Sequence, residues 1–255
     1  MERHEAHMRR ALDLAERGWG RVSPNPMVGA VVLSSDGRVL GEGWHEGPGT
    51  RHAEVMALDE AGEASRGATV VCTLEPCDRF GRTPPCTDAL IRAGVALVLV
   101  AATDPDLEGD APGLTKLREA GIEVHQGVLE AEARQLNDAF ERHVTTGKPF
   151  VTLKSGATVD GKTAAADGTS QWITSDQARA DAQRLRAWSD AIAVGSRTVL
   201  HDDPSLTVRD PRWEAARAPL RVVVDAAGRV PPTMTVFDDA APTFVATTDL
   251  SLIHI

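Results

Sequence analysis

Residues 68–77 read Ala-Thr-Val-Val-Cys-Thr-Leu-Glu-Pro-Cys, and this stretch decides the fold. Its first seven residues are mostly apolar and rich in β-branched side chains, which predicts a buried strand of ordinary length. Pro76-Cys77 comes directly after that strand. His52-Ala-Glu54 precedes the stretch and Cys86 follows it. The strand end is therefore accompanied by one histidine and two cysteines, the ligand types that zinc prefers.

The histidine and the two cysteines predict a catalytic zinc site. Such a site takes three protein ligands and leaves the fourth position for water, whose pKa falls from about 16 to about 7. Glu54 is then free to carry a proton from the water to a leaving amine. The order H-x-E and then P-C-x-x-C is typical of zinc nucleobase deaminases, although here residues 78–85 separate the two cysteines. The alternative is a purely structural zinc, which normally has a fourth Cys or His nearby.

The third cysteine is not expected to bind the metal. Cys72 lies inside the apolar strand, so we predict a small buried hydrophobic side chain rather than a ligand. With two of three cysteines assigned to zinc, no disulfide framework is expected, which favours a reducing cytoplasmic location.

The composition limits the classes of function. The 255 residues are 42% hydrophobic and 25% charged, values typical of a soluble globular protein with one or two domains. No apolar run approaches the roughly 20 residues of a membrane helix, and the N-terminal residues lack the apolar core of a signal peptide. The net charge of −10 argues against a nucleic-acid groove but is compatible with a small phosphorylated substrate.

Alternating apolar runs and helical patterns predict a layered α/β domain in the first half. The expected helices are 5–17, 52–61, 87–93, 114–120 and 129–144, and the expected strands are 28–33, 38–43, 68–74, 95–101 and 122–125. The zinc motifs would lie at helix starts beside strand ends, where open α/β sheets usually place their sites.

Residues 145–149 are expected to be a linker to a second α/β unit. Its predicted strands are 150–155, 191–195, 220–225 and 243–247, and its helix runs to Trp188 from a capping box formed by Thr174 and Gln177. No G-x-G-x-x-G is present, so a Rossmann nucleotide site has no support.

The motifs together resemble the RibD family, the bifunctional deaminase–reductases of riboflavin biosynthesis. The segments that carry the resemblance are residues 25–31, 41–45, 52–54, 73–77, 81–86, 153–154, 160–162, 170–174, 194–195, 202–207 and 209. The resemblance implies a cytidine-deaminase-like three-layer domain over residues 1–146. A partial dihydrofolate-reductase-like α/β domain is implied over 147–255. The first domain would remove the 2-amino group of a diaminopyrimidinone carrying a ribosylamino 5′-phosphate, and the second would use NADPH to reduce ribosyl to ribityl.

The resemblance also assigns roles by position. It implies that His52, Cys77 and Cys86 bind one zinc ion and that Glu54 is the proton shuttle. The implied substrate residues are Asn25, His45 and Arg82 in the first domain and Ser170, Arg186, Leu206 and Arg209 in the second. The implied NADPH residues are Gly156, Trp172, Thr198 and Asp202. Simpler roles stay open: a turn cap for Asn25, a solvated loop for His45, a charged helix face for Arg186 and a core aromatic for Trp172.

Two positions depart from the family pattern. Arg79 stands where relatives usually have a histidine, and Asp106 stands where they usually have an asparagine. Asp106 places a negative charge where an amide would meet the phosphate, and an ion pair with Arg79 would compensate for it.

The family's reductase is expected to continue past residue 255, and Leu250-Ser-Leu-Ile-His-Ile255 resembles a translated sequencing adapter, so we treat residues 250–255 as foreign. NADPH binding is accordingly expected to be weak or absent. Two other functions remain open: a nucleoside or transfer-RNA deaminase, and a zinc-stabilised module without catalysis. The sequence leaves the oligomeric state undecided; a homo-oligomer is compatible with it.

Overall fold

The computed structural model describes residues 2–106, 111–213 and 217–248. The chain divides into two compact units, Met1–Val151 and Thr152–Ile255, and each is described by itself. The suggestion that residues 250–255 are foreign falls outside the described residues.

A five-stranded sheet forms the centre of the first unit. Its order is β2-β1-β3-β4-β5, with β1 antiparallel to both of its neighbours and β3, β4 and β5 parallel. The strands are β1 (Gly29–Leu33), β2 (Val39–Trp44), β3 (Thr69–Leu74), β4 (Leu97–Ala102) and β5 (Glu123–Gln126). All five predicted strands of this half are therefore present, with ends shifted by one or two residues.

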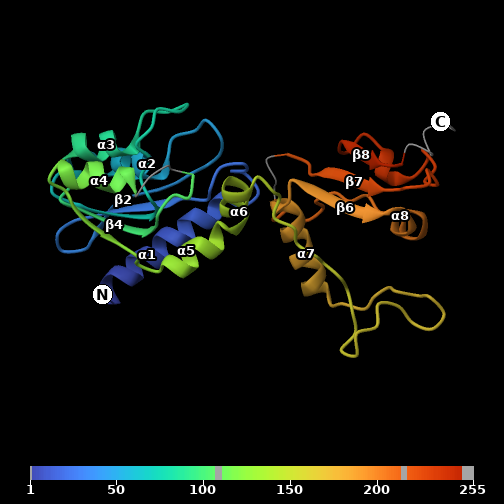
Figure 1. Cartoon of the computed structure of the whole chain (residues 1–255). Helices are drawn as coiled ribbons and strands as arrows, with labels where there is room; N and C mark the ends of the chain where they lie inside the picture. Colours follow the sequence, from blue (N-terminus) through green and yellow to red (C-terminus); the bar gives the residue numbers. More distant parts are fainter. Residues whose placement is uncertain (1, 107–110, 214–216, 249–255) are drawn as a thin grey trace. The chain divides into compact units, whose positions relative to one another are not determined.

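Helices cover both faces of this sheet (Figure 1). The helices are α1 (Glu2–Ala15), α2 (Ala53–Ala61), α3 (Cys86–Ala93), α4 (Pro112–Glu119), α5 (Glu130–Leu136) and α6 (Asp138–Thr146). One apolar core lies between the sheet and α2, α3 and α4, and it includes Cys72, which is fully buried as predicted. A second core lies between the other face and helices α1 and α5. The unit is thus a three-layer α/β/α sandwich.

Glycines in the strands bring the helices unusually close to the sheet. A Cβ atom at Gly43 of β2 would lie 2.1 Å from the carbonyl oxygen of Ala53, the first residue of α2. A Cβ atom at Gly29 of β1 would lie 2.0 Å from the carbonyl oxygen of Ala11. Only glycine allows this approach, and at Gly43 it fixes the first turn of α2, which carries Glu54.

The predicted single helix over residues 129–144 is wrong, because the chain forms two helices separated at Asn137. The backbone of Asn137 has φ −111° and ψ 19°, which does not continue the helix. Its side chain bonds instead to the main chain of Met27. A tertiary contact between residues 110 positions apart therefore overrides the local helical pattern.

The second unit contains a three-stranded parallel sheet in the order β6-β7-β8. Its elements are α7 (Asp176–Trp188), β6 (Ala191–Gly195), α8 (Ser196–Asp202), β7 (Leu220–Val224) and β8 (Thr243–Ala246). A small core formed by Val199, Leu206, Val223 and Val236 packs against one face of this sheet. Three of the four strands predicted for this half are present.

Two local predictions in the second half are wrong. Residues 150–155 form no strand, and the side chains of Val151 and Leu153 are 81% and 93% exposed. Without a neighbouring strand, an alternating pattern has no ladder to join. The cap of α7 is Ser175 and not Thr174, since the Ser175 hydroxyl accepts the hydrogen bond of the Ala178 N–H.

Among the described residues, no helix combines the length and the apolar character needed to cross a bilayer.

Candidate active site

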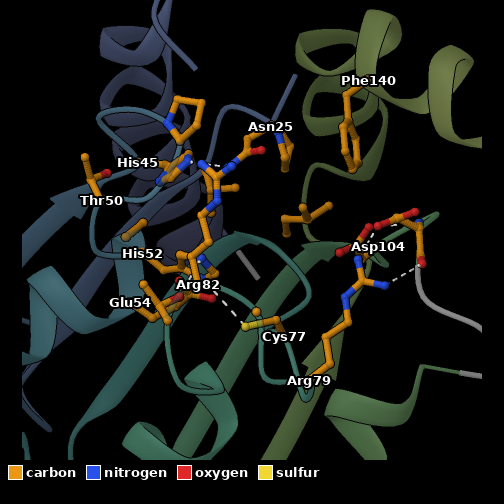
Figure 2. Close-up of a pocket in the computed structure, with 18 of the residues that line it drawn as sticks. Asn25, His45, Thr50, His52, Glu54, Cys77, Arg79, Arg82, Asp104 and Phe140 are labelled. Carbon is orange, nitrogen blue, oxygen red and sulfur yellow. Dashed lines mark hydrogen bonds and ion pairs between the residues drawn. The ribbon is translucent and has the colours of Figure 1, made fainter. Parts of the chain in front are cut away.

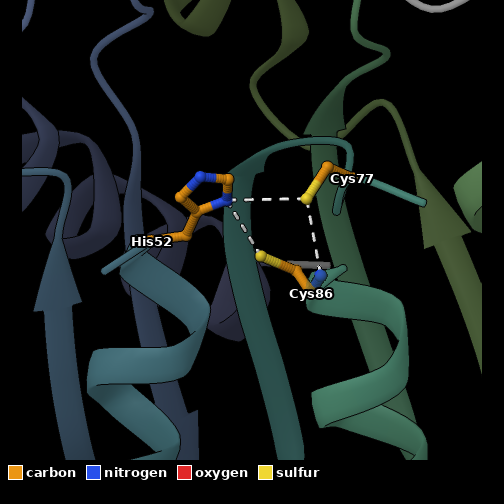
Figure 3. A group of neighbouring side chains, drawn as sticks. All are labelled: His52, Cys77 and Cys86. Atoms are coloured by element: carbon orange, nitrogen blue, oxygen red, sulfur yellow. Dashed lines mark hydrogen bonds between the residues drawn. The ribbon is translucent and has the colours of Figure 1, made fainter. Parts of the chain in front are cut away.

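His52, Cys77 and Cys86 come from three different elements and converge on one point (Figure 3). His52 is the residue before α2, Cys77 follows β3, and Cys86 is the first residue of α3. The Nδ1 atom of His52 lies 3.5 Å from the Cys77 Sγ and 3.1 Å from the Cys86 Sγ. The three ligand atoms all lie within 4.8 Å of one another. One nitrogen and two sulfurs at this separation fit a tetrahedral zinc ion that keeps one position open.

Polar contacts fix the orientation of these ligands. The Nε2 atom of His52 lies 3.1 Å from the Thr83 hydroxyl, which holds the ring with Nδ1 toward the cysteines. The backbone N–H of Cys86 donates to the Cys77 Sγ at 3.4 Å. Thr83 was not predicted from the sequence, because its contact depends on how residues 78–85 fold back over the histidine.

Lys116 links the residues that follow Cys77 to those that follow Cys86. The Nζ of Lys116, on α4, lies 2.5 Å from Asp78 and 2.8 Å from Asp88. The Thr87 hydroxyl also donates to Asp78 at 2.9 Å. Since Asp78 follows Cys77 and Asp88 lies in the first turn after Cys86, this network holds both cysteines against α4.

The pKa values of the two cysteine thiols are shifted in opposite directions. A hydrogen bond from Cys86, reinforced by His52 and opposed by burial, lowers the pKa of Cys77 to about 4. The hydrogen bond with Cys77 and burial together raise the pKa of Cys86. A divalent cation bound here would favour the deprotonated form of both cysteines, because thiolate is the ligand form.

Glu54, which the H-x-E motif places two residues after His52, is 3% exposed. Burial, with the nearby Cys77 thiolate adding to it, raises the pKa of Glu54 to about 7. A cation bound by the three ligands would oppose this rise. A carboxyl group with a pKa near neutrality can both accept and return a proton.

Glu54, His52 and Cys77 form the floor of a cavity of about 410 Å³ (Figure 2), whereas Cys86 is fully buried and does not line it. The cavity walls come from the loops at the carboxyl end of the parallel strands, where α/β sheets bind ligands. The other lining residues are Pro24, Asn25, Pro26, Val28, His45, Pro48, Gly49, Thr50, Ala53, Leu74, Glu75, Arg79, Gly81, Arg82, Thr83, Asp104, Asp106 and Phe140. No role in the site was predicted for Glu75, Asp104 or Phe140, although Glu75 belongs to segment 73–77, which carries the resemblance.

Asn25 and His45 lie together on one wall. The Asn25 Nδ2 and the His45 Nε2 are 3.0 Å apart, so the amide donates if the imidazole is neutral at that nitrogen. Burial lowers the pKa of His45, which favours this neutral form. His45 is 4% exposed, so it is not the solvated loop residue considered above.

Arginines lie at the open side of the cavity. Arg82 is exposed and reaches over Gly49, where a Cβ atom would lie 3.8 Å from its guanidinium. Arg79 forms an ion pair with Asp106, the compensation expected above. The two departures from the family pattern therefore neutralise one another.

The predicted reductase residues are only partly brought together. Arg186 on α7 donates to the Thr207 carbonyl at 3.0 Å, and the Arg209 N–H donates to Gln183 of the same helix. Burial, and next the positive charge of Arg209, lower the pKa of Arg186. Leu206 is buried in the core with Val199, Val223 and Val236. Arg186 and Arg209 thus lie together at α7, whereas Leu206 belongs to the core of this unit.

The remaining predicted residues of this half lie on separate segments. Trp172 is 71% exposed and stacks under Arg179, with the guanidinium 4.4 Å from the ring centroid, so it is not a core aromatic. Thr198 and Asp202 are exposed on α8, and Asp202 pairs with His201 at 2.8 Å. The others, Gly156 and Ser170, are half-buried in the irregular stretch before α7.

Two family models match the chain. Residues 1–102 match the cytidine and deoxycytidylate deaminase zinc-binding region, and residues 149–251 match the RibD C-terminal domain. These matches confirm the predicted fold class, a cytidine-deaminase-like domain followed by the reductase-like domain of that family.

Similar proteins extend over nearly the whole chain. Riboflavin biosynthesis protein RibD of Escherichia coli (strain K12) is 49% identical over 254 residues, which cover 96% of this chain and 69% of that protein. RibD of Aquifex aeolicus (strain VF5) is 49% identical, with coverage of 94% and 67%. The solved structure of Acinetobacter baumannii RibD has a TM-score of 0.88 at 42% identity, and covers 97% of this chain and 70% of that one. Geometry and similarity agree, and the chain belongs to the RibD family.

Proposed function

We propose that the first unit catalyses the hydrolytic deamination of 2,5-diamino-6-ribosylamino-4(3H)-pyrimidinone 5′-phosphate in riboflavin biosynthesis. The observation that carries the proposal is the convergence of His52, Cys77 and Cys86 beneath a cavity whose floor also holds a buried glutamate. A module stabilised by structural zinc would have no need of Glu54 at that position.

The residues of the site would act in a simple sequence. His52, Cys77 and Cys86 would hold zinc, which when bound makes water acidic enough to ionise near pH 7. Glu54 would accept the proton of the attacking water. It would then deliver that proton to the amino group at C2, which leaves as ammonia while the ring carbon keeps the oxygen. Asn25 and His45 would hold the pyrimidine ring against the wall of the cavity.

Ammonia release from the phosphorylated diaminopyrimidinone tests the proposal, with zinc-loaded enzyme and with enzyme treated with a chelator. We expect release only with zinc. Cytidine and a transfer-RNA anticodon stem are the comparison substrates, and faster release from either would favour the nucleoside or transfer-RNA deaminase instead.

Arg82 is proposed to bind the substrate phosphate, because its guanidinium reaches over the cavity and offers a fork of donors that suits phosphate oxygens. Arg82→Ala should raise KM for the phosphorylated substrate by about tenfold, in line with the loss of one charge-assisted contact. The dephosphorylated substrate should respond little to the change. Equal losses on both substrates would show that Arg82 only supports the loop. Added salt should also weaken binding by the wild type.

Asp106 is expected to reduce the affinity for the phosphate, since it brings a negative charge to the same side of the cavity and occupies Arg79. Asp106→Asn should lower KM for the phosphorylated substrate by roughly two- to fivefold, the size expected for an exposed charge interaction. The variant Arg79→Gln should have the opposite effect. An unchanged KM in both variants would place the pair outside the phosphate site.

For the second unit we propose the reductase role of the family, with Ser170, Arg186, Leu206 and Arg209 toward the substrate and Gly156, Trp172, Thr198 and Asp202 toward NADPH. Two arginines near one end of α7 support a site for an anionic substrate, because their mutual repulsion is relieved by a bound anion.

A further inference from the structure

We infer that Asn137 is a positioning residue for the deaminase pocket. It holds two parts of the cavity wall in place: the segment of residues 24–28, which contains Asn25, and helix α6, which carries Phe140. The kinetic part of this inference rests on the proposed function. Asn137 itself does not line the cavity.

Asn137 lies in the break between α5 and α6 and is 6% exposed. Both heteroatoms of its side-chain amide are used on one residue. The Oδ1 accepts the Met27 N–H at 2.8 Å, and the Nδ2 donates to the Met27 carbonyl at 2.9 Å. This is the pairing that a neighbouring strand would provide. Met27 lies before β1, which begins at Gly29.

Met27 is the member of residues 24–28 that does not line the cavity. Pro24, Asn25, Pro26 and Val28 all do. The Met27 side chain is instead buried in a small cluster with Ala15 and Val22. The amide of Asn137 therefore holds residues 24–28 through the one residue among them that does not line the cavity.

The segment of residues 24–28 is linked to His45 at two points. The His45 N–H donates to the Val28 carbonyl at 2.9 Å, and the Asn25 Nδ2 lies 3.0 Å from the His45 Nε2. A shift of Met27 would therefore move the main-chain neighbour and the side-chain partner of His45 together. His45 is in turn close to the zinc site, with its ring centroid 5.6 Å from that of His52.

The same residue sets the start of α6. The Asn137 carbonyl accepts the Glu141 N–H at 2.9 Å, which begins the helix that carries Phe140. Figure 2 shows Phe140 hanging from this helix toward the side of the cavity where Asp104 lies. Asn137 thus connects two cavity walls that are more than 100 residues apart in the sequence, one through its side-chain amide and the other through its main-chain carbonyl.

The test uses the zinc-loaded full chain with Asn137→Ala, the isosteric Asn137→Asp, and Met8→Ala as a control. Met8 is fully buried in the same unit, on α1, and lines no part of the cavity. All three variants are expected to lower Tm. Asn137→Asp keeps an acceptor for the Met27 N–H, but its carboxylate cannot donate a hydrogen bond to the Met27 carbonyl. This variant therefore remains informative if Asn137→Ala does not fold.

We expect both Asn137 variants to raise KM for the phosphorylated diaminopyrimidinone by about tenfold or more, since small misplacements of site groups have effects of 10–10². Met8→Ala should change KM by less than about twofold. The losses from Asn137→Ala and Asn25→Ala should be less than additive in the double variant, because both act through one wall. Kinetic changes in Met8→Ala equal to those in the Asn137 variants would overturn the inference.

Hydrogen exchange gives a readout that does not need activity. The peptide containing Met27 and the peptide containing His45 should exchange faster in both Asn137 variants and not in Met8→Ala. Unchanged exchange at both peptides would overturn the inference even if the wild type is active. Faster exchange with an inactive wild type would instead sustain the positioning role and refute the proposed reaction.

Discussion

Cys77→Ala combined with Cys86→Ala is expected to remove zinc from the chain and to abolish deamination. The two sulfurs provide two of the three ligand atoms that lie within 4.8 Å of one another. One histidine alone cannot hold the ion, because structural and catalytic zinc sites need three or four protein ligands. The loss of several kcal/mol of metal assistance corresponds to a rate lower by at least about 10³.

Metal analysis of the purified protein and the ammonia assay check this expectation together. Cys72→Ala is the matched control, since it removes a thiol of the same type from the buried core. That variant should keep one zinc per chain, although the space left by the missing thiol in the core will lower Tm. Unchanged zinc content in the double variant would end the assignment of the site.

Glu54→Gln is expected to keep zinc and to lower the deamination rate by at least about 10², because positioned proton transfer contributes about 10²–10⁴. The amide is nearly isosteric with the carboxyl group, so the buried position should remain filled. It cannot accept the proton of water and return it to the amine. The effect should fall on kcat, with little change in KM, since Glu54 acts on the reacting atoms.

Glu60→Gln makes the same chemical change on the same helix, at an exposed residue that accepts the Glu42 N–H. Its rate should stay close to that of the wild type. A Glu54→Gln variant with wild-type turnover and one bound zinc would show that another group carries the proton.

The order of the strands in the first unit could be predicted from the sequence because it depends on local patterns. The apolar run at 68–74 became β3, and the Ser34-Ser-Asp-Gly37 turn between two apolar runs became the β1–β2 hairpin. The histidine and cysteine motifs predicted a zinc site because their chemistry is distinctive even in isolation, and the structure brings the three side chains together. These features need no knowledge of distant residues.

Tertiary structure decided the walls of the site. Thr83 contacts His52 because residues 78–85, between the two cysteines, fold back over the histidine. Phe140 lines the cavity from α6, which begins after the break in the helical pattern of 129–144. That break occurs at Asn137, whose amide satisfies the Met27 main chain. A buried N–H or C=O without a partner costs about 1–3 kcal/mol, more than the helical preference of one residue, which is at most about 1 kcal/mol for residues other than proline. The sequence around Asn137 shows only the helical preference, which is the smaller of these two energies. The position of the break was therefore decided by Met27, which lies 110 residues away in the sequence.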